Sequence, residues 1–313
     1  MIEIRWNTLD LPRWNELFRR IDDSNILQCY NYARVVRVRH FMNARWGQIF
    51  WDGVDVGLVQ AHDVSLLFGV LHSIIIDRGP LFYRPVPAEA HAAFWAEINR
   101  LWPSRLGRKR RFMPELLDNA ENDALLAHSG LKCRKMQKYS TIFVDFMPDI
   151  DEMRMKLRSN WRNHLKKAEK SGIIVDNSND ADDLTWFMRE YAADRLNRRY
   201  RGPGIRTLAV MWDYFGQSDD RLFLVARSGD KRIAGALFFR HGASVTYQVG
   251  WADAEGRTLQ APSLLLWRAM LYFKERGVRS IDLGGIDDVH AAGVTDFKRG
   301  LNGNERTLVG WYC

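Results

Sequence analysis

Apolar residues recur every three or four positions in several stretches of the chain, a period that predicts amphipathic helices. These stretches are residues 9–21, 30–41, 88–101, 149–171, 182–200 and 262–276. Between them lie short runs rich in β-branched and aromatic residues, which predict strands. The runs are residues 46–51, 54–76, 173–176, 221–227, 232–239, 244–251, 280–283 and 306–311. Helices that alternate with strands in this way predict an α/β fold.

The second half of the chain repeats the order of the first. A hairpin around Asp52 and Gly53 has a counterpart around residues 228–230, and Gly235 occupies the place that Gly57 holds in the first hairpin. Matching elements recur at an offset of about 170 to 180 residues, which indicates the duplication of one module.

We therefore expect two α/β modules with a cleft between them that admits the substrate. The first spans residues 1–148 and the second residues 149–304. The last strand, within residues 305–313, is expected to return to the first module.

The segment between the halves is strongly basic. Asp149 with Glu152 predicts the start of a helix, and Gly172 predicts its end. The cations of this helix are Lys156, Arg158, Arg162, Lys166, Lys167 and Lys170. The next helix ends in Arg195, Arg198, Arg199 and Arg201. Because each neutralised phosphate adds a salt-sensitive increment of binding, these clusters can follow a phosphate backbone; the alternative is an ordinary solvated surface.

The charge balance of the whole chain points the same way. Its net charge of +8 and pI near 9.5 favour polyanionic partners such as nucleic acid, nucleotide phosphates or an acidic membrane surface. The three cysteines, Cys29, Cys133 and Cys313, lack the spacing of a disulfide framework or a zinc site and suit a reduced cytoplasm. No signal peptide is evident, and the longest apolar run is too short to span a bilayer, so we expect a soluble protein, at most peripheral to a membrane.

The most site-like stretch is residues 280–303. A short strand is followed at once by Gly284 and Gly285, which can let the backbone turn tightly or lie against a ligand. Phe297 and Lys298 follow, an aromatic face beside a cation. Such a pair can hold an anion or a carbonyl oxygen; otherwise Phe297 is a packing residue and Lys298 is solvated.

Several kinds of chemistry lack their signatures. The eight histidines are scattered without ligand spacing, which argues against a metalloenzyme, and no nucleophile elbow, P-loop or dinucleotide fingerprint is present. Acyl or group transfer remains, in which an amine attacks an ester or thioester and Lys298 stabilises the oxyanion. The sequence does not choose the base that takes the amine proton. The candidates are Asp282, Asp287, Asp288, His290 and Asp296.

The order of these features resembles the Fem-type aminoacyltransferases, enzymes of the peptidoglycan interpeptide bridge built from two acetyltransferase-like (GNAT) domains. The matching pieces are Ile26-Leu-Gln-Cys-Tyr-Asn-Tyr-Ala-Arg, Asp77-Arg-Gly-Pro-Leu, Trp161-Arg-Asn-His-Leu-Lys-Lys-Ala-Glu-Lys-Ser-Gly, Ala192-Ala-Asp-Arg, Asp282-Leu-Gly-Gly-Ile and Phe297-Lys298. The resemblance implies transfer of an amino acid from aminoacyl-tRNA, with no other cofactor, to an amine on a peptidoglycan precursor, a peptide or a small metabolite.

The resemblance also assigns residues. It implies that Phe297 and Lys298 line the acyl-transfer region, beside Asp282, and that Arg195 contacts the anionic part of the acceptor. The backbone at Gly284 and Gly285 completes the expected substrate site. The basic helices would then bind tRNA, through the residues Arg162, Lys166 and Lys167.

One departure concerns the acceptor. Enzymes of this type that act on the nucleotide-linked cell-wall precursor carry a lysine where this chain has Val36, and Arg34 is the nearby but shifted cation. This puts that precursor in question as the acceptor, while Arg34 remains a candidate for substrate binding.

Two alternatives stay open. The first is an acyl-CoA N-acyltransferase that uses acetyl-CoA, whose pyrophosphate loop would fall at residues 257–262. There Arg257 is present, but the cradle glycines are missing and Pro262 has no N–H. The second alternative is a catalytically silent RNA- or lipid-binding module on the same fold.

Overall fold

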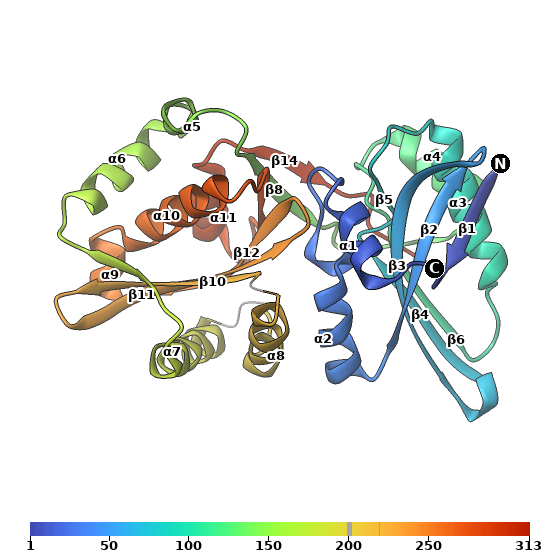
Figure 1. The fold of residues 1–313 in the computed structure, drawn as a ribbon, viewed down its shortest axis with the longest axis horizontal. Helices are drawn as coiled ribbons and strands as arrows, with labels where there is room; N and C mark the ends of the chain where they lie inside the picture. The colour runs from blue at the N-terminus through green and yellow to red at the C-terminus, as the bar shows by residue number, and fades with distance from the viewer. Residues whose placement is uncertain (199–201, 219) are drawn as a thin grey trace. The chain divides into compact units, whose positions relative to one another are not determined.

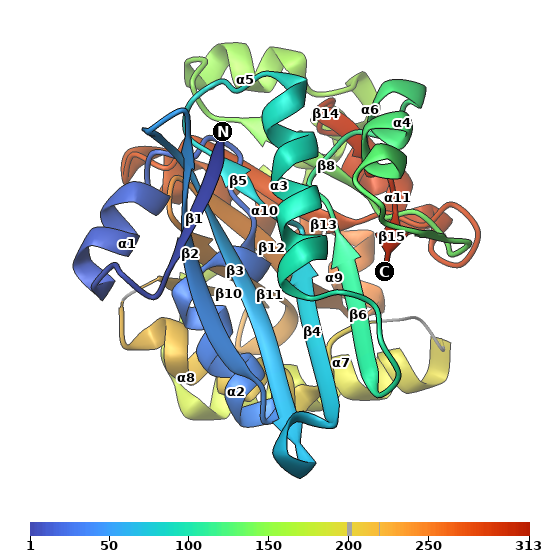
Figure 2. The same ribbon diagram turned by 90° about the vertical axis from the view of Figure 1, so that its right-hand side faces the viewer.

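The computed structural model describes residues 1–198, 202–218 and 220–313. The chain divides into two compact units, one made of residues 1–140 and 306–313 and the other of residues 141–305. Each unit is one sheet with helices on both faces, as Figure 1 shows for the second unit and Figure 2 for the first. The predicted α/β class is confirmed.

The first unit contains a sheet of eight strands in the order β1-β2-β3-β4-β6-β15-β7, with β5 paired to β3. Its strands are β1 (Ile2–Trp6), β2 (Asn43–Trp51), β3 (Val54–Leu66), β4 (Leu71–Asp77), β5 (Leu81–Phe82), β6 (Arg108–Met113), β7 (Cys133–Arg134) and β15 (Trp311–Tyr312). Its helices are α1 (Leu11–Phe18), α2 (Tyr30–His40), α3 (Ala88–Leu101) and α4 (Ala120–His128), with short 3-10 turns η1 (Ile26–Gln28) and η2 (Leu67–Gly69).

The second unit contains a sheet of seven strands in the order β14-β8-β13-β12-β11-β10-β9. Its strands are β8 (Ser140–Asp145), β9 (Ile174–Asn177), β10 (Arg221–Ser228), β11 (Lys231–His241), β12 (Ser244–Ala252), β13 (Ser280–Gly285) and β14 (Asn304–Thr307). Its helices are α5 (Ile150–Lys156), α6 (Ser159–Glu169), α7 (Ala181–Arg198), α8 (Ile205–Gly216), α9 (Ala254–Thr258), α10 (Ala261–Glu275) and α11 (Ala292–Arg299). Figure 1 shows α6 and α10 on one face of this sheet and α7 and α8 on the other.

The two sheets share one plan. Strands β1-β2-β3-β4-β6 follow one another as β9-β10-β11-β12-β13 do. Each sheet contains one parallel pair within this run, β4 with β6 in the first and β12 with β13 in the second. The strand before each parallel pair, β3 or β11, pairs antiparallel with its neighbour β4 or β12. The parallel pair is joined by a helix that crosses over the sheet, α3 in one unit and α10 in the other, as parallel pairing requires.

Local sequence explains the hairpins that begin each plan. The β2–β3 turn places Asp52 and Gly53 both at positive φ, the geometry of a two-residue hairpin turn that twists with its strands. Gly57 and Gly235 both lie inside strands. A Cβ at these positions would approach neighbouring atoms to 2.6 Å and 2.7 Å respectively. Both positions therefore exclude a side chain, as the repeated pattern suggested.

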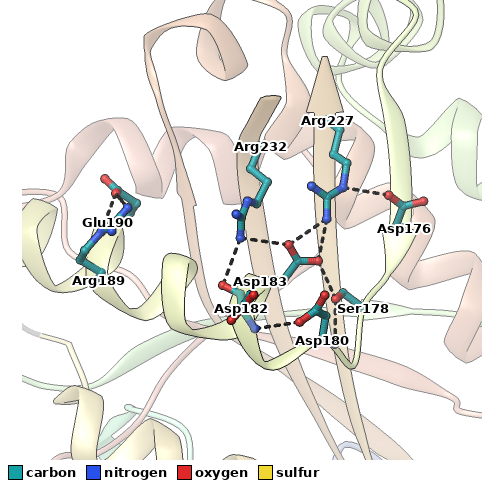
Figure 3. A network of polar contacts seen from close by, with 9 residues as sticks. All are labelled: Asp176, Ser178, Asp180, Asp182, Asp183, Arg189, Glu190, Arg227 and Arg232. Atoms are coloured by element: carbon teal, nitrogen blue, oxygen red, sulfur yellow. Dashed lines mark hydrogen bonds and ion pairs between the residues drawn. The ribbon is translucent and has the colours of Figure 1, made fainter. Parts of the chain in front are cut away.

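A polar network fixes the start of α7 against the second sheet (Figure 3). The carboxylate of Asp183, which is 4% exposed, accepts hydrogen bonds from Ser178 and from both Arg227 and Arg232. These cations and this hydroxyl hold the pKa of Asp183 below its usual range, against the opposing effect of burial. Because Arg227 also pairs with Asp176, the network joins β9, α7, β10 and β11.

Three details differ from the sequence prediction. The basic segment forms two helices, because Leu157 and Arg158 adopt extended backbone between α5 and α6. Phe297 and Lys298 lie in a helix, α11, where no helix was predicted. The single predicted terminal strand is two short strands, β14 in the second sheet and β15 in the first.

Candidate functional site

The parallel pair of the second sheet comes apart before its strands end. Its register runs only from Ser244 opposite Ser280 to Thr246 opposite Asp282, although β12 and β13 both continue. The corresponding pair of the first sheet, β4 with β6, stays in register up to Asp77 opposite Met113. The early separation of β12 from β13 therefore distinguishes the second unit from the first.

Irregularities in the flanking ladders accompany this separation. The register of β11 with β12 shifts between Leu237, opposite Val249, and Phe238, opposite Tyr247. The register of β13 with β8 shifts between Asp282 and Gly285. An extra residue on one strand bends it and redirects its side chains, so both strands change direction where their pairing ends.

The bulge in β13 depends on Gly284 and is held by Asp282. Gly284 has φ of +73°, a conformation that residues with a Cβ adopt reluctantly. Its N–H donates to Oδ1 of Asp282 at 2.8 Å, and the hydroxyl of Thr141 contacts both that oxygen and the carbonyl of Gly284. Asp282 is 1% exposed. The geometry makes Asp282 a residue that positions the bulge.

Lys298 lies against this bulge. Its side chain is 7% exposed, and Nζ donates to the carbonyl oxygen of Gly285 at 2.7 Å. A Cβ built on Gly284 would lie 3.8 Å from Nζ and 3.4 Å from the carbonyl oxygen of Tyr247. Lys298 Nζ, the Gly284 backbone and the carbonyl of Tyr247 on β12 thus meet just beyond the last paired residues of β12 and β13.

Burial gives this lysine an unusual acidity. It lowers the pKa of Lys298 to about 8, and the charge of Asp282 acts in the opposite direction. A lysine of this kind holds both protonation states near neutral pH, which suits a group that donates to a developing negative charge or exchanges a proton. The alternative of a solvated Lys298 does not describe this structure.

Phe297 has a packing role in the structure. Its ring lies 6.0 Å from that of Trp161, centroid to centroid, and is half-buried against the core of the second unit. Residue 300 is a glycine in the same contact, since a Cβ there would approach Cδ1 of Trp161 to 2.4 Å. The aromatic contact anchors α11 on α6 and so fixes the direction from which Lys298 enters the site.

The aspartates Asp287, Asp288 and Asp296, which the sequence offered as bases, are less suited to proton abstraction than Lys298. Asp287 accepts hydrogen bonds from the backbone and side chain of His290, and these lower its pKa to about 2. Asp288 is paired with Arg299. Asp296 is exposed on α11.

The predicted cations fall into different environments. Arg162 donates to the carbonyl oxygens of Met155 and Leu157, at the end of α5, and therefore has a structural role. Lys166 and Lys167 are exposed in the last turn of α6.

Arg195, on α7, is half-buried and donates to the carbonyl oxygen of Gly202 at 2.8 Å. Its guanidinium therefore has a backbone partner at Gly202. The predicted cations Arg199 and Arg201 lie outside the described residues.

Arg34 belongs to the first unit, on α2, where it is half-buried, and Val36 on the same helix is buried. Two of the pieces that carry the Fem-type resemblance meet close to this helix. The side chain of Gln28 exchanges hydrogen bonds with the backbone of Gln60 and donates to the carbonyl of Asp77, and Asn25 donates to the carbonyl of Arg78. These contacts lock the segment before α2 to the end of β4.

Sequence reasoning missed Thr141 and the carbonyl of Tyr247. Thr141 contacts Asp282 across 141 positions of the chain. A threonine in a β-prone run is ordinary, so nothing local could single it out.

The start of α10 bears on the acyl-CoA alternative. Pro262, the second residue of the helix, has no N–H, and the N–H groups of Ser263 and Leu264 both donate to the carbonyl of Gln260. Gln260 stands at positive φ, and Arg257 donates to the carbonyl of Ala252. Few backbone donors therefore remain there to hold a pyrophosphate.

Within residues 1–198, 202–218 and 220–313, no cluster of His, Cys, Asp or Glu side chains is arranged to hold a metal ion. In that same part of the chain, no helix combines the length and hydrophobicity needed to cross a bilayer.

Comparison with known proteins confirms the fold. Residues 155–299 match the family model described as an acetyltransferase (GNAT) domain. The crystal structure of FemX superposes with a TM-score of 0.80 at 15% identity, over 98% of this chain and 96% of that chain. No curated protein sequence matches significantly.

Two other solved structures extend over both units. A conserved protein of unknown function from Bacteroides thetaiotaomicron has a TM-score of 0.63 at 11% identity, over 99% of this chain and 98% of that chain. A tandem GNAT protein from the clavulanic acid biosynthesis pathway has a TM-score of 0.53 at 11% identity, over 100% and 98%. The predicted tandem GNAT fold, and with it the likeness in fold to a Fem-type protein, is confirmed.

Replacing Gly284 by alanine tests the bulge. We expect the free energy of unfolding to fall by about 1 kcal/mol, because a Cβ is unfavourable at this φ. We expect kcat to fall at least tenfold, because the methyl group fills space beside Lys298 Nζ. Denaturant unfolding and steady-state kinetics measure the two effects.

Gly293→Ala is the matched control, since a Cβ at Gly293, on α11 of the same unit, meets no atom within 4 Å. Equal losses of kcat in the two variants would remove the bulge from the active site.

Proposed function

We propose that this protein is an N-acyltransferase that moves an aminoacyl group from aminoacyl-tRNA to an amine. In this reaction the amine nitrogen forms a bond to the acyl carbon and the ester bond to the ribose oxygen breaks. The amine loses a proton and the ribose hydroxyl gains one. The acceptor amine belongs to a peptidoglycan precursor, a peptide or a small metabolite.

The observation that carries the proposal is the buried ammonium of Lys298 where β12 and β13 separate. An oxyanion forms when the amine adds to the acyl carbonyl, and a preorganised donor out of bulk water stabilises that charge more than water does. Lys298 is held in place by the carbonyl of Gly285 and by the Phe297–Trp161 contact. The GNAT match over residues 155–299 supports acyl transfer in this same unit.

The choice of donor rests on two features. The start of α10 is poor in free N–H groups, which disfavours the pyrophosphate of acyl-CoA. The exposed cations at the end of α6 suit the phosphates of tRNA. Acetyl-CoA remains the second candidate donor, because the matching family model describes an acetyltransferase domain.

A donor-discharge experiment tests the proposal. Purified protein is incubated with a pool of charged tRNAs and, separately, with acetyl-CoA, each in the presence of cell extract as the source of acceptor. We expect loss of the aminoacyl ester from tRNA and no protein-dependent loss of the thioester. Discharge of acetyl-CoA alone would overturn the choice of donor, and discharge of neither would favour a silent binding module.

Reversing two charges on α6 tests the RNA footprint. Lys166→Glu with Lys167→Glu is expected to weaken tRNA binding and to reduce the slope of log Kd against log salt by roughly one to two. Filter binding at several salt concentrations measures both.

Lys132→Glu with Lys135→Glu makes the same change in net charge at exposed lysines of the first unit. If the control pair changes the slope as much as the α6 pair, the effect reflects net charge and α6 is not part of the footprint.

A further inference from the structure

The connection between β3 and β4 in the first unit carries a cluster of exposed apolar side chains. We define the apolar tip as Leu66, Leu67, Phe68, Val70, Leu71 and Leu106. Phe68 is 111% exposed and Leu106 is 99% exposed. Figure 2 shows this connection extending beyond the ends of the neighbouring strands. Single exposed apolar residues are common on soluble proteins, but a cluster of this kind marks an interaction surface.

Hydrogen bonds hold the apolar tip in a defined conformation. The guanidinium of Arg105 donates to the carbonyl oxygens of Gly69 at 2.5 Å and Val70 at 3.1 Å. The N–H of His72 donates to the carbonyl of Gly107 at 2.9 Å. These bonds tie the segment that carries Leu106 to the turn that carries Phe68, so both sets of side chains are presented together.

The backbone of the turn is strained in a way that stability does not require. Leu67 and Phe68 have φ of 51° and 54°, in the left-handed region that glycine and asparagine occupy readily and large side chains do not. A turn selected for stability alone would carry one of those small residues. Strain of this kind at an exposed position is typical of a functional segment.

The two segments that form the apolar tip carry charges of one sign, and the nearest carboxylate on β3, that of Asp63, is buried and paired with Arg45. Residues 64–76 and 98–114, which form the turn and its neighbouring segment, contain no aspartate or glutamate. Arg105, Arg108 and Lys109 stand in these segments, with Lys109 exposed. Apolar side chains flanked by cations complement a bilayer surface with anionic headgroups, which offers acyl chains beneath a layer of negative charge.

Other occupants fit this surface less well. In a symmetric contact between two copies the same cations would face one another. RNA would satisfy the cations but leave the leucines and Phe68 in water. We therefore propose that the apolar tip docks this protein on the surface of a membrane that contains anionic lipids, with Leu67 and Phe68 entering the interface. The docking does not depend on which acyl group the second unit transfers.

Vesicle co-sedimentation tests the proposal. Full-length protein is mixed with vesicles of phosphatidylcholine alone or of phosphatidylcholine with phosphatidylglycerol, and the bound fraction is measured at low and high salt. We expect binding to the anionic vesicles that weakens with salt. The double variant Leu67→Asn with Phe68→Asn should lose binding at least tenfold. Asparagine tolerates positive φ, so these substitutions suit the turn.

Matched controls keep the test sharp. Leu196→Asn with Met136→Asn removes two apolar side chains that are 78% and 60% exposed elsewhere, and it should bind as the native protein does. Leu106→Asn and Lys109→Glu, each alone, should also bind more weakly than the native protein. They replace the double variant if circular dichroism shows that it is misfolded.

Three results would overturn the proposal. They are no binding of the native protein to anionic vesicles, equal binding by the native protein and the tip variants, or a dimer in sedimentation velocity that the tip variants dissociate. Transfer RNA can also be tested as a competitor of the vesicles. If tRNA competes for the native protein and for the Leu67 and Phe68 double variant but not for Lys109→Glu, the surface binds RNA instead.

Discussion

Replacing Lys298 by methionine is expected to lower kcat about a hundredfold, the scale of losing one oxyanion donor. Methionine fills a similar volume and carries no charge, so the loss would come from the missing ammonium. KM should change much less, because the donor acts on charge that develops only in the transition state. Steady-state kinetics with the donor identified by the discharge experiment measure both constants.

The pH profile separates this role from a purely structural one. Because the pKa of Lys298 is lowered to about 8 by burial, the protonated donor is lost as the pH rises through that value. We expect kcat of the native enzyme to fall above about pH 8 and this falling limb to be absent from the Lys298→Met variant.

Lys274→Met is the matched control for this experiment. Lys274 also lies in the second unit and donates to two backbone carbonyls, those of Phe146 and Pro148, but it is on α10. Its removal should leave kcat and the pH profile unchanged. A rate that rises through pH 8 in the native enzyme would instead make the neutral amine of Lys298 the active form.

Lys298→Met is also expected to raise the free energy of unfolding, by about 2 kcal/mol at pH 7. The folded pKa of about 8 lies below the ordinary value of 10.5, so the folded state disfavours the proton. That penalty is about 3 kcal/mol below pH 8, and loss of the hydrogen bond to Gly285 offsets about 1 kcal/mol of the gain. Gly285 is exposed, so water can take over the bond to its carbonyl.

The sign of the pH dependence follows from proton counting. Between pH 8 and 10.5 the unfolded chain binds more protons than the folded protein, so the stability of the native enzyme rises with pH over this range. The advantage of the variant should therefore be full below about pH 8 and disappear toward pH 10.5. Denaturant unfolding at pH 7, 9 and about 10.5 measures it. A variant that is less stable at pH 7 would contradict the burial argument.

Much of the fold could be predicted from the sequence because its signals are local. The turn at Asp52 and Gly53, the cap at Asp149 and the repeated order of strands each depend on residues close together in the chain. The break between α5 and α6 and the helix α11 were not predicted. Arg162 closes α5 from a later helix, and α11 depends on contact of Phe297 with Trp161.

The candidate site was predicted only in outline. Gly284 and Lys298 stood out by residue type, and the structure brings them together. The positioning role of Asp282 could not be predicted, because its partner Thr141 comes from the start of the second unit. Arg162 was predicted as a tRNA contact because it belongs to a basic cluster on a helix, whereas in the fold it donates to two carbonyls.

The sequence by itself determined the α/β class, the doubled plan and the positions where only glycine fits, because backbone geometry and hydrophobic period are properties of neighbouring residues. Only the tertiary structure decided that β12 and β13 separate after Thr246 and Asp282, and that Lys298 is buried beside the point of separation. Burial and strand pairing are set by atoms far away in the chain, and it is burial that changes the acidity of this lysine.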